Sequence, residues 1–96
     1  MAKQYRWSIQ EDEINEESGE PTGKQIEHTV ELTCSYLTGK AVITIDGDRF
    51  DISTRPFALR GTNQMFRLGD LAAQVEFPKQ GSPRIIVDGE AVPQKV

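Results

Sequence analysis

Cys34 and His28 are the two residues in this chain whose types could supply the nucleophile and the general base of a thiol enzyme. A thiol enzyme needs the imidazole within hydrogen-bond reach of the sulfur. Both residues fall on the same face of the alternating run IEHTVELTCSY, which also carries Ile26 and is expected to be the inner face. Six residues of strand separate them by about 20 Å. This spacing excludes a catalytic pair. We therefore interpret Cys34 as a small core residue and His28 as a partly covered surface residue near the start of its strand.

The sequence lacks the residue patterns that a metal site or a pair of catalytic carboxylates requires. Structural zinc takes four Cys or His ligands, and the chain has one of each. The acidic run from Glu11 to Glu20 lacks the alternate acids and central glycine of an EF-hand loop. Asp46 and Asp48 flank a tight turn in which the first has a backbone role. We therefore predict no catalytic, metal-binding or cofactor-binding residue, no cofactor, and no enzymatic activity.

Aromatic and basic side chains are the remaining candidates for binding. Trp7 is the single tryptophan, and we interpret it as a core residue. Outward strand positions carry arginines that either protect sheet edges or form a small site for an anion or a partner. These are Arg49, Arg67 and Arg84, with Arg55 and Arg60 nearby in the sequence.

Alternation with a period of two recurs along the chain, with Gly, Pro, Asn and Asp between the alternating runs. This pattern predicts strands joined by tight turns. Two-residue hairpins at Asp46-Gly47, Gly69-Asp70 and Asp88-Gly89 sort most apolar residues to one face. A further short strand is expected around Phe57 and Leu59. The fold class is all-β, an antiparallel β-sandwich or partly open barrel of about seven or eight short strands.

The predicted registers make specific pairs. They place Ile45 opposite Asp48, Ile43 opposite Phe50, Leu68 opposite Leu71, Phe66 opposite Ala73, Val87 opposite Glu90, and Ile85 opposite Val92. The acids after two of the turns, Asp48 and Glu90, then fall on the otherwise apolar face. We predict that both lie at the rim of the core with their carboxylates in solvent or paired with a base.

Length and charge bound the organisation. The 96 residues suit a single domain over 1–96, and the acidic stretch at residues 11–23 is expected to be a mobile loop because dense like charges resist compaction. A net charge of −4 argues against nucleic acid or an anionic membrane as a partner. One cysteine and no apolar signal-like run predict a cytoplasmic location, and no segment has the roughly 20 apolar residues of a membrane span.

Three stretches resemble the Fas apoptotic inhibitory molecule family: HTVELTCSYLTGKAVITIDGDRF, PFALRGTNQMFRLGDLAAQVEF and PRIIVDGEAV. The resemblance covers about residues 28–93 and follows the family's order of an H-x-V-E-L strand, T-G-K, a D-G turn, an F-x-L strand, F-x-x-G, an A-x-V-x-F strand and a final V-D-G. It implies a compact antiparallel β domain without catalytic residues that works through protein interactions. Animal members are associated with restraining cell death and with protection against protein aggregation. This chain has one repeat unit where those members have two, and no functional residue is carried over.

The leading functional hypothesis is a non-catalytic protein-interaction or chaperone-like β module. The alternative is a small-ligand binding domain for a sugar or an anion that uses Trp7 or the outward arginines. A third class, an enzyme that uses Cys34, would require an accessible thiol of low pKa. The identity of the protein partner and the oligomeric state stay open, because exposed edge strands can pair between chains.

Overall fold

Residues 2–94 are described by a computed structural model, and they form eight strands and no helix. In chain order the strands are β1 (Lys3–Ile14), β2 (Pro21–Cys34), β3 (Ala41–Ile45), β4 (Asp48–Asp51), β5 (Thr62–Leu68), β6 (Leu71–Phe77), β7 (Arg84–Val87) and β8 (Glu90–Val92). Within the described range there is accordingly no helix long and apolar enough to cross a membrane.

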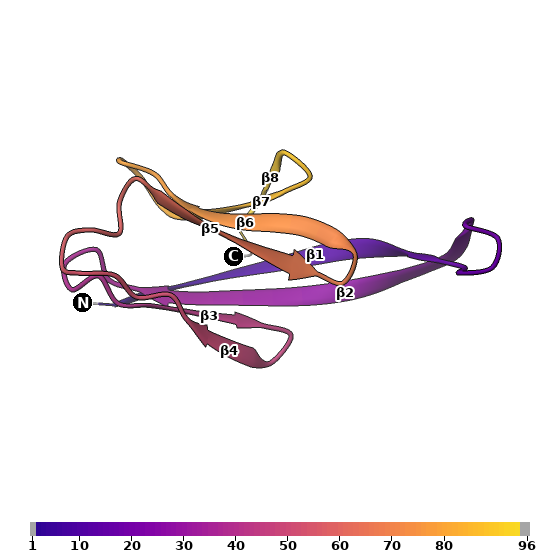
Figure 1. Cartoon of the computed structure of the whole chain (residues 1–96), viewed down its shortest axis with the longest axis horizontal. Helices are drawn as coiled ribbons and strands as arrows, with labels where there is room; N and C mark the ends of the chain where they lie inside the picture. The colour runs from indigo at the N-terminus through magenta and orange to yellow at the C-terminus, as the bar shows by residue number, and fades with distance from the viewer. Residues whose placement is uncertain (1, 95–96) are drawn as a thin grey trace.

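The strands build two antiparallel sheets, in the orders β1-β2-β3-β4 and β5-β6-β7-β8 (Figure 1). Among the described residues, every strand is hydrogen-bonded only to its neighbours in the sequence, so both sheets are meanders built from consecutive hairpins. This arrangement confirms the predicted all-β class with about eight strands. β4 and β5 are each an edge strand of their sheet.

The three predicted turns have the backbone that their residues favour. Asp46 and Gly47 take φ values of 49° and 92°, and Asp88 and Gly89 take 49° and 83°, as a type I′ turn requires. Gly69 takes a φ of 60° at the first central position of its turn, as in type II′. The registers confirm all the predicted pairs: Ile45 with Asp48, Ile43 with Phe50, Leu68 with Leu71, Phe66 with Ala73, Val87 with Glu90 and Ile85 with Val92.

The core lies between the two sheets. The least exposed side chains come from both of them, including Trp7, Val30 and Leu32 of the first sheet and Val75, Phe77 and Ile85 of the second. Trp7 is 1% exposed and Cys34 is 3% exposed, which confirms both as core residues. Asp48 and Glu90 are exposed, as expected at the rim.

The loop expected over residues 11–23 is wrong in extent. β1 continues to Ile14 and β2 begins at Pro21, so only residues 15–20 connect them. The continued ladder satisfies backbone groups despite the dense acids, and Gln25 Nε2 donates to Asp12 Oδ1 at 3.3 Å across the strands. The Asn15 side-chain oxygen accepts the backbone N–H of Glu17 at 2.9 Å and so fixes the turn.

The two strands beyond the sandwich form a projecting hairpin, residues 12–27, which we call the arm (Figure 1). Residues 14–27 are all exposed, and the molecule measures 48 × 23 × 23 Å. Ile26 was expected on the inner face but is 41% exposed, because the second sheet does not extend over the arm.

The strand expected around Phe57 and Leu59 is also wrong. This segment crosses from the first sheet to the second, and it contains a turn in which the Ala58 N–H donates to the Arg55 carbonyl oxygen at 3.0 Å. Phe57 has a φ of 62° and is 74% exposed, whereas Leu59 is 1% exposed in the core. A segment between two sheets finds no strand to pair with, so alternation alone did not make it a strand.

Candidate functional site

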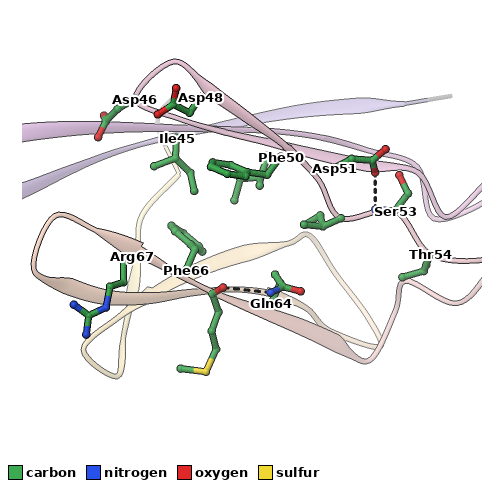
Figure 2. A pocket seen from close by; sticks show the side chains of 13 residues that line it. Ile45, Asp46, Asp48, Phe50, Asp51, Ser53, Thr54, Gln64, Phe66 and Arg67 are labelled. Carbon is green, nitrogen blue, oxygen red and sulfur yellow. Dashed lines mark hydrogen bonds between the residues drawn. The ribbon is translucent and has the colours of Figure 1, made fainter.

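A groove of about 860 Å³ runs between the two edge strands β4 and β5 (Figure 2). Figure 2 shows Ile45 and Phe50 from the first sheet pointing across the groove toward Phe66 from the second. Phe50 is 51% exposed. The lining residues are Ile43, Ile45, Asp46, Asp48, Phe50, Asp51, Ile52, Ser53, Thr54, Gln64, Met65, Phe66 and Arg67.

Both strands that border the groove have an unpaired backbone edge. Over residues 2–94, β4 pairs only with β3, and β5 pairs only with β6. The Met65 carbonyl oxygen, on β5, accepts a hydrogen bond from the Gln64 side-chain amide at 3.3 Å instead of from a strand. The groove therefore combines an apolar interior with backbone donors and acceptors along its rim.

The charges of the groove are mainly acidic. Asp46, Asp48 and Asp51 line the groove on the β4 side, and Arg67 is the one basic side chain among the described residues that line it. Figure 2 shows Arg67 pointing away from the interior. Asp51 accepts the Ser53 backbone N–H at 2.9 Å, and hydrogen bonds from Ser53 lower the pKa of Asp51 below its ordinary value. Asp51 is thus held as a carboxylate at neutral pH.

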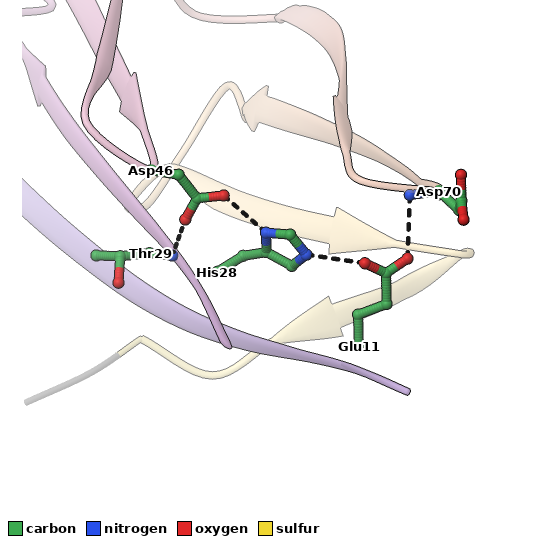
Figure 3. A network of polar contacts seen from close by, with 5 residues as sticks. All are labelled: Glu11, His28, Thr29, Asp46 and Asp70. Carbon is green, nitrogen blue, oxygen red and sulfur yellow. Dashed lines mark hydrogen bonds and ion pairs between the residues drawn. The ribbon is translucent and has the colours of Figure 1, made fainter. Parts of the chain in front are cut away.

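A hydrogen-bonded network adjoins the groove at Asp46 (Figure 3). His28 Nδ1 donates to Asp46 Oδ2 at 2.7 Å, and His28 Nε2 donates to Glu11 Oε1 at 2.9 Å. The second oxygens of these acids accept backbone N–H groups, of Thr29 at 2.8 Å and of Asp70 at 3.0 Å. The network therefore joins β1, β2 and the β3–β4 turn to the β5–β6 turn of the other sheet.

Gly69 makes the link to the second sheet possible. A Cβ at this position would collide with Glu11 Oε1. Without the Cβ, the backbone of the β5–β6 turn approaches closely enough for the Asp70 N–H to reach the Glu11 carboxylate.

His28 is positively charged in this network, because two carboxylates leave each ring nitrogen only the role of a donor. Burial acts to lower the pKa of His28, but the hydrogen bonds to Asp46 and Glu11 outweigh it and raise the pKa above its ordinary value. The hydrogen bond from His28 lowers the pKa of Glu11. Burial acts to raise the pKa of Asp46, and the hydrogen bonds from His28 and Thr29 outweigh it and lower that pKa.

This geometry corrects the prediction for His28. The residue is 6% exposed and not part of the surface, because its strand position faces the core and two acids satisfy its ring. With both nitrogens engaged, His28 has no free lone pair to act as a base on a ligand. Cys34 lies elsewhere in the core, and burial raises the pKa of its thiol.

A smaller cleft of about 410 Å³ has Lys3, Tyr36 and Arg60 among its lining residues. The Arg60 guanidinium lies 3.8 Å from the centre of the Tyr36 ring and donates to the carbonyl oxygens of Pro78 and Gly81 at 3.2 and 3.1 Å. Burial raises the pKa of Tyr36 to about 12.

The predicted arginines are divided among several places. Arg67 borders the groove and Arg60 borders the cleft. Arg84 forms an ion pair with Glu76 at 2.6 Å. Trp7 packs against Tyr5 with their ring centroids 6.2 Å apart, and its burial removes it as a ligand-stacking residue.

Sequence reasoning missed the network of Glu11, His28 and Asp46. One signal was present: the alternation of Tyr5, Trp7 and Ile9 continues to Glu11 and places this acid on the inner face. The assignment of Glu11 to a loop hid it. Over residues 2–94, no group of three or more His, Cys, Asp or Glu side chains is arranged to hold a metal ion.

Comparison of the chain with protein-family models, curated proteins and solved structures found no match.

Proposed function

We propose that this protein is a non-catalytic interaction module that binds a partner protein in the groove between β4 and β5. The observation that carries the proposal is the open apolar groove itself, with Phe50 half exposed between two sheets. A partner side chain that covers an exposed aromatic or branched residue gains about 1.5–3 kcal/mol if the burial is complete. The resemblance to a family that works through protein interactions supports the same function.

The chemistry of the two reactive side chains also favours binding over catalysis. Both nitrogens of His28 are held by carboxylates, and the thiol of Cys34 is buried with a raised pKa. A cytoplasmic location belongs to the same proposal, since the single cysteine has no partner for an internal disulfide. The acidic net charge favours a protein partner over nucleic acid or an anionic membrane.

Selection of peptides from a random display library, followed by affinity measurement, tests this function. Phe50→Asn should weaken binding of the selected peptides about tenfold or more, because roughly 1.4 kcal/mol corresponds to a factor of ten. Phe57→Asn is the matched control. Phe57 is more exposed than Phe50 and lies outside the groove, so its substitution should leave the affinity unchanged.

Two outcomes would contradict the proposal. In the first, no peptide is enriched over an unrelated β protein of similar charge. In the second, the enriched peptides bind the Phe50→Asn and Phe57→Asn variants equally well.

A small anion in the cleft beside Tyr36 is the second candidate function. The Tyr36 hydroxyl is buried without a hydrogen-bond partner among the described residues, and Lys3 and Arg60 line the same cleft. A buried hydroxyl without a partner costs about 1–3 kcal/mol, and an anionic ligand that accepts its hydrogen bond would recover this energy. Titration with inorganic phosphate and with acetate, followed by NMR, tests the idea. Binding should weaken in Tyr36→Phe, and the absence of shifts in the cleft with both anions would reject it.

A further inference from the structure

We propose that the occupant of the groove is a basic, extended peptide segment that adds as a new strand to the free edge of β5. This inference rests on the proposed function and specifies its partner. β5 has the longer of the two edges that border the groove, because it has seven residues where β4 has four.

The register of the β5–β6 hairpin shows which backbone groups of β5 are free. In a two-residue hairpin, the residues that flank the turn exchange both backbone hydrogen bonds, and this pattern recurs at every second residue. The flanking pair here is Leu68 and Leu71, so Leu68, Phe66 and Gln64 direct their backbone groups to β6. Asn63, Met65 and Arg67 direct theirs away from the sheet. These three residues form the edge on which a strand would pair.

An added strand would place every second side chain in the groove. Its inner side chains would continue the face of Phe66 and cover Phe50, which Figure 2 shows on the opposite wall. Its outer side chains would lie beside Met65, which is 71% exposed. The partner therefore needs apolar residues at alternate positions, as in other complexes formed by strand addition.

The negative charge of the groove favours a basic partner over a second copy of this chain. Asp48 lines the groove on the same face of β4 as Phe50 and so lies on the wall that would face the added strand. Two copies that each carry −4 also repel one another. The end of the groove at the β3–β4 turn also opens on the side from which the arm projects (Figure 1). The Asp46 N–H donates to the Thr29 carbonyl oxygen at 2.9 Å, two residues beyond the arm. Lysine or arginine residues that follow the apolar segment would lie beside the acids of the arm.

Synthetic probes separate the two parts of this inference. The first probe is a fluorescent peptide of alternating valine and threonine followed by four lysines, and the second ends in four glutamates. Fluorescence anisotropy should show at least tenfold tighter binding of the lysine probe, with a difference that shrinks as salt is added. Equal affinities for the two probes would overturn the charge selection.

Backbone methylation of the lysine probe tests strand addition without altering the protein. A strand has two edges, and alternate N–H groups point to each of them. Methylation of the alternate amides on one edge should abolish binding, whereas methylation of the other set should preserve it. If the two methylated probes bind equally, or both fail to bind, strand addition is wrong.

A matched pair of charge reversals locates the acids that matter. Asp48→Lys should weaken binding of the lysine probe about tenfold and leave the glutamate probe no weaker. Glu90→Lys is the control, because Glu90 occupies the equivalent position after the second Asp-Gly turn and lies outside the groove. Equal effects of the two reversals would show that the groove carries no specific charge selection.

The outcomes also distinguish this inference from the proposed function. Selected peptides that depend on Phe50 but show no preference between methylated edges or between charges would keep the binding function and overturn the basic added strand. A concentration-dependent dimer that Met65→Arg dissociates would show that a second copy occupies β5, and it would overturn the inference as well.

Discussion

His28 holds a positive charge between two carboxylates at the boundary of the core. A buried charge is costly unless partners surround it, and here Asp46 and Glu11 supply them at 2.7 and 2.9 Å. The two acids are in turn satisfied by backbone N–H groups. The complete network joins the two sheets, and His28 is its centre.

The stability of the protein should therefore depend on pH in two directions. The folded pKa of His28 is raised, so its contribution is complete below the ordinary pKa of about 6.5 and is lost as pH rises through the folded pKa. The folded pKa values of Glu11 and Asp46 are lowered. Their contribution is complete above about pH 4.5 and is lost as pH falls through the folded values. Stability should be greatest between these limits.

His28→Gln tests the alkaline side of this dependence. Urea denaturation should show the free energy of unfolding of the wild type falling as pH rises above about 6.5 and through the folded pKa of His28, while the variant changes little. At about pH 6 the variant should be less stable by about 2 kcal/mol, because two charge-assisted hydrogen bonds are lost. His28 is the only histidine in the chain, so no other imidazole titrates in this range. Parallel curves for the two proteins would show that His28 is not charged in the fold.

Cys34 should be unreactive in the native state. The residue is 3% exposed and burial raises the pKa of its thiol, so both access and thiolate formation are reduced. Labelling with a thiol reagent at about pH 8 should be at least a hundredfold slower in buffer than in denaturant. Fast labelling in buffer would reopen a role for this cysteine as a nucleophile.

At the scale of the element, the hairpins follow from their turn residues, whereas the crossing between sheets depends on contacts with other parts of the chain. The crossing segment of residues 52–61 is tied to the β2–β3 connection, where the Thr54 N–H donates to the Gly39 carbonyl oxygen at 2.7 Å. Gly39 has a φ of 77°, and a Cβ there would collide with the carbonyl oxygens of Arg55 and Thr54. Gly39 thus lets two connections pack together.

Gly39→Ala and Gly23→Ala form a matched test of this packing. Both glycines have a positive φ, of 77° and 86°, but no atom lies within 4 Å of the Cβ position at Gly23. Each substitution should cost about 1–2 kcal/mol for the left-handed backbone. Gly39→Ala should cost at least about 2 kcal/mol more, because the collision is with backbone. Equal unfolding free energies for the two variants would show that the connections are not packed as described.

The alternation that predicted the hairpins failed where burial is absent or pairing is impossible. The alternation placed Ile26 on the face that is buried further along the same strand. The second sheet ends before the arm, however, so Ile26 has nothing to cover it and is 41% exposed. The alternation also placed a strand around Phe57, where the chain has to turn from one sheet to the other. In both places the sequence alternates as a strand does, but no neighbouring element is present to bury the apolar side chain or to pair with the backbone.

At the scale of the whole molecule, a compact sandwich carries a long acidic arm. Within the described part of the chain, the two strands of the arm pair only with each other, and a two-stranded ribbon of this kind is marginally stable alone. Its exposure from residue 14 to residue 27 indicates that the sandwich does not depend on it. The arm therefore adds negative charge and length to the molecule and contributes little to the packing of its core.

Replacement of residues 12–25 by Asn-Gly tests this independence. Glu11 and Ile26 pair directly across the strands, so a two-residue turn can join them. The shortened protein should keep its free energy of unfolding within about 1 kcal/mol, with a smaller urea m-value because less surface is exposed on unfolding. The change removes five carboxylates and one lysine, and it should also weaken binding of the lysine probe several-fold. A shortened protein that does not fold would show that the arm stabilises the sandwich.

The three tight turns, their registers and most of the strands could be predicted from the sequence alone, because they depend on residues close together in the chain and on a period of two. The groove and the charged network, in contrast, follow from the packing of the two sheets. Glu11 meets His28 across 17 residues, Asp46 meets His28 across 18, and Asp70 meets Glu11 across 59. The groove likewise exists because β4 and β5 end their sheets on the same side without pairing. Such contacts depend on how the two sheets pack together, and a local pattern of residue types does not show which distant residues will meet.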